Sequence, residues 1–494
     1  MSKLILSIDQ GTSGSKAIIF TDEGEILCDG RAPLASYFPA EGFVEQNPGE
    51  IYKSVIDAVS DSLSQLDSTS YKISDIQCCG ISNQRETFLL WDRQGIPLTE
   101  AVVWQCKRSV SICKELKDNL KENFFRKKTG LFLDPYFSGT KLIWLYRNLE
   151  PVRMKIESGE ALFGTVDTWL LYNLTAGESY KTDYTNASRT LLFNLKTLQW
   201  DKEILTELHV SSLKLAEVLP SAACFGESDF KGLFERKIPI TAMIGDSHAA
   251  SFGERCFANG TAKATMGTGS SILLNTGEYV DPEQTSMVST ICWSTEDKVA
   301  YALEGIIVSC GSTINWMSDK LGIFKTDKEA DQIADSLEDN GNVYLVPAFS
   351  GLGAPWWKMN QKAQIRGLTF GSDFRHIIRA GLESIVYQIT SVIREMEKDS
   401  GSSLATLQID GGVSSSPFIG QLLADLNTTK IIRCKVKEAS ALGAALLAGL
   451  QSGIYSSIEK LPESKYDDDL ILRQDNKQII RSYEKWLSIV EELD

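Results

Sequence analysis

The sequence has no excess of positive charge: 65 acidic residues outnumber 50 lysines and arginines, and the formal net charge is −15. Nucleic acids and anionic membrane surfaces are bound through basic faces, so this balance argues against both kinds of partner. A phosphorylated small molecule is not excluded, because it needs only a local cluster of hydrogen-bond donors. We therefore expect a small-molecule substrate and no nucleic-acid partner.

The sequence also lacks the patterns of zinc-bound, disulfide-rich and membrane proteins. Its ten cysteines form no C-x-x-C pair, which argues against a zinc site and a dense disulfide framework. The first residues carry no secretory pattern, and the longest strongly apolar stretch, 441–450, is too short to span a bilayer. We expect a cytoplasmic protein without membrane insertion, whose cysteines are mostly small buried hydrophobes in a reducing compartment.

What is present is a long chain of ordinary globular composition. Its 494 residues, 43% hydrophobic and 23% charged, predict two large domains rather than one core. Strand-like and helix-like segments alternate, which favours an α/β fold. The expected strands are 3–8, 16–20, 76–81, 88–92, 239–244, 262–266, 272–274 and 407–410. The expected helices are 48–66, a long one after His376 and a closing amphipathic one over 479–490, with 325–342 and 462–477 as polar surface segments.

The most informative segment is Asp9–Ser13 (DQGTS), which separates the first two strands. A tight turn with bare backbone N–H groups and hydroxyls can cradle phosphate, and the carboxylate before it can hold magnesium through water. An ordinary hairpin with a positive-φ glycine fits the same residues. The pattern recurs in the second half, where strand 239–244 ends in Gly245 and Asp246 and strand 262–266 runs into Gly267–Ser271 (GTGSS). Two distant copies of one turn predict a duplicated fold with a cleft between its halves.

Longer motifs follow one another along the whole chain. They are Ile8–Ser13 (IDQGTS), Gly80–Glu86 (GISNQRE), Val103–Cys106 (VWQC), Asp134–Trp144 (DPYFSGTKLIW), Phe163–Leu170 (FGTVDTWL), Thr182–Arg189 (TDYTNASR), Tyr301–Gly305 (YALEG), Val346–Pro355 (VPAFSGLGAP) and Asp410–Gly412 (DGG). With them the sequence resembles the FGGY family of carbohydrate kinases and, within it, the glycerol kinases, nearly end to end. DPYFSGTK and TDYTNASR are far more specific than any glycine loop.

The resemblance implies a fold and an activity. The fold is α/β, with two ribonuclease-H-like domains of the actin, Hsp70 and sugar-kinase type and an ATP cleft between them. We assign a polyol-binding domain to residues 1–250 and a nucleotide-binding domain to residues 251–494. The implied activity is ATP-dependent phosphorylation of a small polyol, first of all glycerol to sn-glycerol 3-phosphate. The resemblance also implies a homodimer or homotetramer.

Phosphoryl transfer needs in-line positioning, neutralised phosphate charge and a group that accepts the hydroxyl proton. The resemblance assigns the last role to Asp246, which ends an apolar strand and would be held rigidly at the cleft floor. As an alternative, Asp246 caps a helix that starts near Ser247. Asp9 would hold Mg²⁺, directly or through water. The implied ATP-binding residues on the two sides of the cleft are Gly11, Thr12, Ser13, Lys16, Thr268, Gly311, Gly411, Gly412 and Ser415.

The acceptor site that the resemblance implies is polar with one aromatic wall. Its residues are Arg85, Glu86, Trp104 and Tyr136, together with Asp246. Arginine and glutamate suit the hydroxyl groups along one edge of a polyol, and an indole suits its C–H face. Such a site rejects analogues that lack a hydroxyl group, because its own polar groups would then be unpaired.

The sequence departs from the glycerol kinase pattern in two places. Glycerol kinases typically continue the base with two glutamines, where this chain has Ser247 and His248, and they place a phenylalanine where it has Ser271. Both changes enlarge the pocket and make it more polar, so erythritol, dihydroxyacetone, a ketotetrose or a pentulose are alternative acceptors. His248 could contact substrate or be a buried structural residue. A non-catalytic sugar sensor is the alternative of a different class, but the intact motifs and the absence of a basic appendage argue against it.

Overall fold

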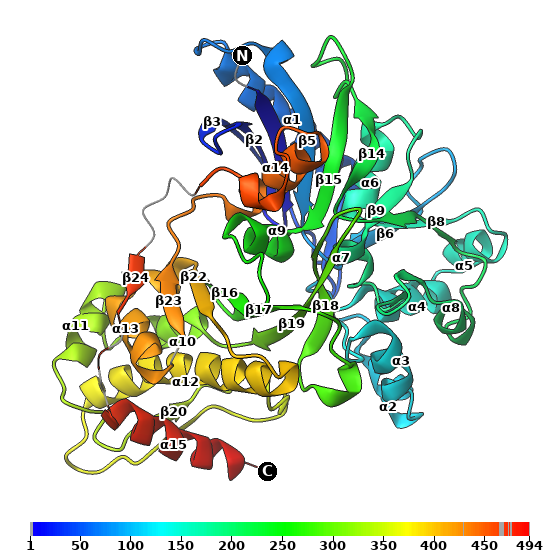
Figure 1. The fold of residues 1–494 in the computed structure, drawn as a ribbon. Coiled ribbons are helices and arrows are strands. Elements are labelled where there is room, and N and C mark those ends of the chain that lie inside the picture. The colour runs from blue at the N-terminus through cyan, green and yellow to red at the C-terminus, as the bar shows by residue number, and fades with distance from the viewer. Residues whose placement is uncertain (1–2, 428, 464–468, 473, 475–476, 494) are drawn as a thin grey trace.

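The computed structural model describes residues 3–427, 429–463, 469–472, 474 and 477–493. Two large mixed sheets, each covered by helices, form two lobes, and a third, smaller layer extends from the first (Figure 1). The fold is therefore α/β, as the alternation of segments predicts. Among the described residues, no helix is both long enough and apolar enough to cross a membrane.

The first sheet has the strand order β14-β15-β5-β1-β2-β3. Its strands are β1 (Leu4–Gly11), β2 (Gly14–Thr21), β3 (Ile26–Pro33), β5 (Ile76–Asn83), β14 (Ala222–Ser228) and β15 (Ile238–Gly245). β1 and β2 form an antiparallel hairpin, whereas β1, β5 and β15 run parallel. In this register Asp9 lies opposite Lys16 on one side and Ser82 on the other.

The second sheet has the order β18-β19-β17-β16-β22-β23-β24. Its strands are β16 (Thr261–Met266), β17 (Ser270–Gly277), β18 (Val288–Ser294), β19 (Val299–Ile307), β22 (Thr406–Asp410), β23 (Lys430–Arg433) and β24 (Asp469–Ile471). β16 pairs antiparallel with β17 and parallel with β22, which repeats the pairing of β1 with β2 and β5. The prediction of a duplicated unit is confirmed, with one Gly-Thr turn at the centre of each sheet.

The third layer surrounds a sheet of five short strands in the order β12-β8-β6-β7-β4. These strands are β4 (Glu45–Gln46), β6 (Phe88–Trp91), β7 (Ala101–Val102), β8 (Leu162–Thr165) and β12 (Lys214–Leu215). The helices around it are α2 (Val110–Asp118), α3 (Glu122–Thr129), α4 (Ser138–Asn148), α5 (Glu150–Glu157), α6 (Val166–Leu174), α7 (Tyr184–Ala187) and α8 (Lys202–Glu207).

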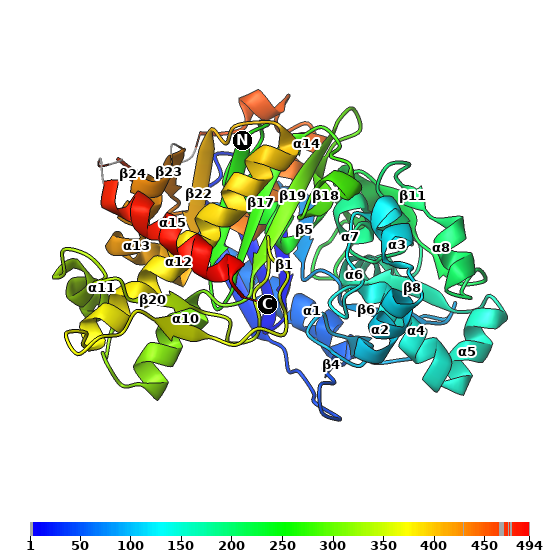
Figure 2. The same ribbon diagram turned by 90° about the horizontal axis from the view of Figure 1, so that it is seen from below.

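The long helices are those that apolar periodicity predicts. α1 (Pro48–Leu66) starts behind Asn47, whose side chain accepts hydrogen bonds from the N–H groups of Gly49 and Glu50. α12 (Phe374–Ser400) crosses the second sheet, and α15 (Lys477–Glu491) packs along it (Figure 2). The polar segment 325–342 contains α11 (Asp327–Asp335). The other predicted surface segment, 462–477, lies partly outside the described residues.

Two helices cross closely beside the cleft. α9 (Asp246–Gly253) follows β15, and α14 (Ala439–Gln451) covers the first sheet although it comes from the end of the chain. A Cβ on Gly443 would lie 1.8 Å from the carbonyl oxygen of Ala249, and one on Gly80 would lie 2.2 Å from that of Ala444. Only glycine permits these approaches, so the two glycines set how closely α14 sits against α9 and β5.

Candidate active site

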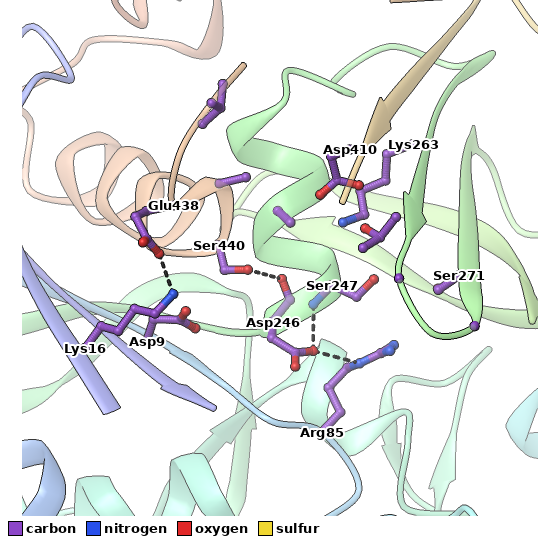
Figure 3. Close-up of a pocket in the computed structure, with 16 residues that line it drawn as sticks. Asp9, Lys16, Arg85, Asp246, Ser247, Lys263, Ser271, Asp410, Glu438 and Ser440 are labelled. Atoms are coloured by element: carbon purple, nitrogen blue, oxygen red, sulfur yellow. Dashed lines mark hydrogen bonds and ion pairs between the residues drawn. The ribbon is translucent and has the colours of Figure 1, made fainter. Parts of the chain in front are cut away.

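A cavity of about 440 Å³ opens between the two large sheets (Figure 3). Its wall is formed by Asp9 of β1 and Lys16 of β2, by the Gly267–Gly269 turn of the second sheet, and by the starts of α9 and α14. Its lining residues are Asp9, Lys16, Arg85, Asp246, Ser247, Ala250, Lys263, Thr265, Gly267, Gly269, Ser271, Asp410, Val436, Glu438, Ala439 and Ser440. Six of the residues singled out in the sequence are therefore brought together here from both halves of the chain.

Asp246 is the first residue of α9 and lies in the middle of the cavity. The N-cap of α9 is Gly245, so the alternative of Asp246 as the N-cap is wrong. Its Oδ1 accepts hydrogen bonds from Arg85 Nε at 3.2 Å and from the Ser247 N–H at 2.6 Å. The side chain is 41% exposed, and Oδ2 has no hydrogen-bond partner in the described part of the chain. A fixed carboxylate with one open oxygen can accept a proton from a bound hydroxyl group.

Asp9 lies near the carboxyl end of β1, across the cavity from Asp246. It accepts a hydrogen bond from Ser82 Oγ at 3.0 Å. Burial is the main reason why the pKa of Asp9 is raised from 3.8 to about 6; Lys16 lowers it and Asp246 raises it further. A bound cation would stabilise the charged form of this desolvated carboxylate, and carboxylate oxygens are hard ligands. Asp9 is therefore suited to be one of the ligands of Mg²⁺. Among the described residues no group of three His, Cys, Asp or Glu side chains could hold a metal ion alone, so the other ligands would be phosphate oxygens and water.

Lys16 lines the cavity and forms an ion pair with Glu438, which comes from the C-terminal half of the chain. Its ammonium group lies 2.5 Å from Glu438, which also lies 2.7 Å from Arg31. Glu438 immediately precedes α14 and adopts a φ of 109°, a conformation that non-glycine residues rarely adopt. These contacts tie the β1–β2 hairpin to the C-terminal segment, and the charge of Lys16 is matched before any ligand binds.

Arg85 belongs to a buried cluster of four charges. Its Nη1 lies 3.1 Å from Glu304, and Arg189 lies 2.6 Å from both Glu304 and Glu86. Burial opposes ionisation of Glu304, but the guanidinium groups of Arg189 and Arg85 outweigh it and hold the pKa of this carboxyl well below its usual range. Since Glu304 comes from β19 and Arg85 from the turn after β5, the cluster joins the two large sheets. Glu304 lies in the YALEG motif, which marks this segment in the sequence but carries no sign of the partners of Glu304.

Glu86 and the predicted aromatic residues do not line this cavity. Glu86 is buried and has a φ of 61°, a strained conformation of the kind that clusters at functional sites. The rings of Trp104 and Tyr136 lie 5.5 Å apart, and Trp104 Nε1 donates a hydrogen bond to Thr12 Oγ1 at 3.0 Å. Lys141, buried in α4, donates to the carbonyl oxygens of Tyr136 at 2.8 Å and Trp104 at 3.3 Å. Its place in the DPYFSGTK motif is the one signal for this role in the sequence.

The positions that depart from the resemblance have different surroundings. Ser271 Oγ donates a hydrogen bond to Glu304 Oε1 at 3.0 Å. Ser247 Oγ is buried without a hydrogen-bond partner in the described structure. His248 is fully buried and does not line the cavity, and burial keeps its pKa well below the usual range. Of its two expected roles, a buried structural residue is therefore the one that the structure favours.

The remaining residues predicted to bind the nucleotide lie near the ends of β16 and β22 and in the β1–β2 turn. The N–H of Gly311 donates to the carbonyl oxygen of Gly267 at 2.8 Å, and Gly411 has a φ of 86° with its Cβ position 2.7 Å from the carbonyl oxygen of Met266. Gly412 and Ser415 line a neighbouring hollow beside α11. Gly11, Thr12 and Ser13 form the β1–β2 turn but do not line the cavity. Of the predicted ATP-binding residues, Lys16 alone is among the lining residues of the cavity.

Comparisons with known proteins give a consistent result. The model of the FGGY family of carbohydrate kinases, N-terminal domain, matches residues 4–253, and that of its C-terminal domain matches residues 262–452. The chain is 44% identical to a glycerol kinase of Thermoanaerobacter sp. over 99% of this chain and 98% of that protein, and 42% identical to glycerol kinase 2 of Thermotoga maritima over 99% and 98%. The crystal structure of Plasmodium falciparum glycerol kinase with ADP superposes with a TM-score of 0.92 at 35% identity, covering 99% of this chain and 98% of that one.

Proposed function

The chain belongs to the FGGY family of carbohydrate kinases, and we propose that it transfers the terminal phosphoryl group of ATP to glycerol, forming sn-glycerol 3-phosphate and ADP. The observation that carries this proposal is the carboxylate of Asp246, held by Arg85 with one oxygen open, between two copies of a Gly-Thr turn. Full-length relatives at 42–45% identity are glycerol kinases, which supports glycerol as the acceptor.

The reaction follows from these positions. A terminal hydroxyl oxygen of glycerol attacks the γ-phosphorus in line, the bond from that phosphorus to the β–γ bridging oxygen breaks, and ADP leaves. The hydroxyl proton passes to Asp246 Oδ2. Arg85 is fixed by Glu304 and keeps Asp246 Oδ1 in place, so the open oxygen is oriented toward the acceptor. Lys16 and Gly11–Ser13 would face the phosphates from the first sheet, and Thr268 from the second.

Asp9 would hold Mg²⁺ directly or through water, and the ion would supply positive charge to the phosphate oxygens. The nucleotide sugar and base would extend past Gly311, Gly411 and Gly412 toward Ser415. Two domains, residues 1–250 and 251–494, a homodimer or homotetramer and a cytoplasmic location complete the proposal. The order of the strands along the chain supports the proposed boundary, because β15 of the first large sheet precedes residue 250 and β16 of the second follows it, although α14 returns to the first sheet.

A larger acceptor is the second candidate. Arg85, Glu86, Trp104 and Tyr136 would bind the hydroxyl groups and the C–H face of either substrate. The specific observation in favour of a larger one is the unpartnered hydroxyl group of Ser247 at the cavity wall. A four-carbon polyol such as erythritol offers one hydroxyl group more than glycerol and could pair with it.

A coupled assay of ADP release tests the proposal with glycerol, dihydroxyacetone, erythritol, erythrulose and pentuloses as acceptors. We expect turnover with glycerol, and Asp246→Asn should abolish turnover while nucleotide binding, measured by calorimetry, stays largely intact. Asp297→Asn, an exposed aspartate in the turn between β18 and β19, is the matched control. Absence of ATP consumption with every polyol tested would favour the non-catalytic sensor, and unchanged turnover of Asp246→Asn would refute the role of Asp246 as the base.

A further inference from the structure

Lys263 is a buried lysine in the centre of the second sheet. It lies on β16, flanked by β17 and β22, and is 2% exposed. Side chains alternate along a strand: Ala262, Ala264 and Met266 belong to the hydrophobic core, whereas Lys263 and Thr265 line the cavity. A lysine is seldom buried so completely unless its charge is matched, so its position calls for a partner at the cavity.

No such partner is in contact with it. Among the described residues, Lys263 has no ion pair within 4.0 Å and no hydrogen bond from its ammonium group. The other cations of the cavity are matched, Lys16 by Glu438 and Arg85 by Asp246 and Glu304. Unlike Lys16 and Arg85, Lys263 therefore has N–H donors that are not already used by a carboxylate and can bind a ligand.

Its surroundings keep it charged. Burial alone would lower the pKa of Lys263, but the charges of Asp410 and Glu254 outweigh it and raise the pKa above the ordinary value. Asp410 lies on the same wall of the cavity, across from Lys16 and Glu438, with Asp246 between the two walls (Figure 3). Since β16 leads directly into the Gly267–Gly269 turn, Lys263 lies on the side of the cavity where the nucleotide phosphates would enter.

We propose that Lys263 is a further catalytic residue, whose ammonium group donates hydrogen bonds to the oxygens of the phosphoryl group while it moves from ATP to the acceptor. The proposal rests on the proposed kinase function. In a site closed to water, a fixed donor aimed at developing charge typically contributes a factor of about 10² to 10³ in rate. The competing role is structural: Lys263 would then only neutralise the buried charges of Asp410 and Glu254.

The experiment compares Lys263→Met, Lys263→Arg and the double variant Lys263→Met with Asp410→Asn. We expect Lys263→Met to lower kcat by about 10² to 10³ with the acceptor KM changed only a few-fold, and Lys263→Arg to recover part of the loss. Lys362→Met, in an exposed loop, is the matched control and should retain wild-type kinetics. Calorimetry with Mg²⁺, glycerol and ADP–fluoroaluminate, which mimics the phosphoryl group in transfer, should show a loss in affinity close to that in kcat, while binding of ADP alone weakens less.

The double variant separates the two roles, because it removes both buried charges and stays informative even where Lys263→Met fails to fold. A double variant as slow as Lys263→Met supports the proposal. Recovery of wild-type kcat by the double variant, or a Lys263→Met enzyme with wild-type kcat, overturns it and leaves the kinase function standing. If the wild-type protein consumes no ATP with any polyol, the proposed kinase function is refuted, and not only the role of Lys263.

Discussion

Replacement of Asp9 by asparagine should make the ligand-free protein more stable while it removes activity. The side chain lies at the end of β1 and keeps its acceptor oxygen for Ser82 Oγ in the amide form. Burial raises the pKa of Asp9 from 3.8 to about 6 in the folded protein. An ionised Asp9 is therefore a local instability, which the cation and phosphates would relieve on binding.

The magnitude follows from proton linkage. The folded state binds the Asp9 proton more tightly than the unfolded state, so the free energy of unfolding falls as the pH rises from 3.8 to about 6, and the full loss remains above that window. A shift of about two pKa units corresponds to about 3 kcal/mol. Asparagine does not titrate, so Asp9→Asn should exceed the wild type by about 3 kcal/mol at pH 7.5.

Urea unfolding without Mg²⁺ or nucleotide, followed from pH 5 to pH 8, measures the difference in free energy of unfolding between Asp9→Asn and the wild type. This difference should grow by about 1 kcal/mol between pH 5 and pH 7, because Asp9 of the folded wild type is only partly ionised at pH 5. Asp297→Asn, in an exposed turn, should show no such trend. Equal stability of Asp9→Asn and wild type at pH 7.5, or a stability difference that does not change with pH, would refute the claim that burial destabilises the ionised form of Asp9.

Two further predictions concern the acceptor side. Lys141→Met should raise the acceptor KM, because the ammonium group that holds the carbonyl oxygens of Trp104 and Tyr136 is lost. Burial lowers the pKa of Lys141 from 10.5 to about 8, so wild-type stability relative to the variant should rise by about 3 kcal/mol between pH 8 and 10.5; a flat difference in urea unfolding would contradict this. Combined Ser247→Gln and Ser271→Phe should shift kcat/KM toward glycerol over erythritol, because the larger side chains fill the cavity wall, and an unchanged ratio would refute the pocket argument.

Much of the fold could be predicted because its signals are local. The turns at Gly11 and Gly267 stand between apolar runs, and each run became the expected strand of its sheet. Helix α1 begins at Pro48 behind an asparagine cap, and α12 follows apolar periodicity. The contact of α14 with β5 was not predicted, because it depends on glycines far apart in the sequence that permit a close approach only after both elements have formed.

The candidate site divides in the same way. The positions of Asp9 and Asp246 at the cavity could be predicted because each comes at the end of an apolar run in the sequence, and the structure places them near the carboxyl ends of β1 and β15. Glu304 and Lys263 could not, because both lie inside strands, where a single charged residue has no local sign of its partners. Glu304 is placed by its contacts with Arg85 and Arg189, which lie more than a hundred positions away along the chain.

The sequence by itself determined the family, the two turns and the residues that end the central strands, since these depend on motifs and on the order of neighbours along the chain. Only the tertiary structure decided which side chains share the cavity and which charges are already matched. Matching depends on distances of a few ångströms between residues from both sheets. Burial then dominates the pKa of Asp9 and Lys141, whereas neighbouring carboxylates outweigh burial at Lys263. No local pattern in the chain carries that information.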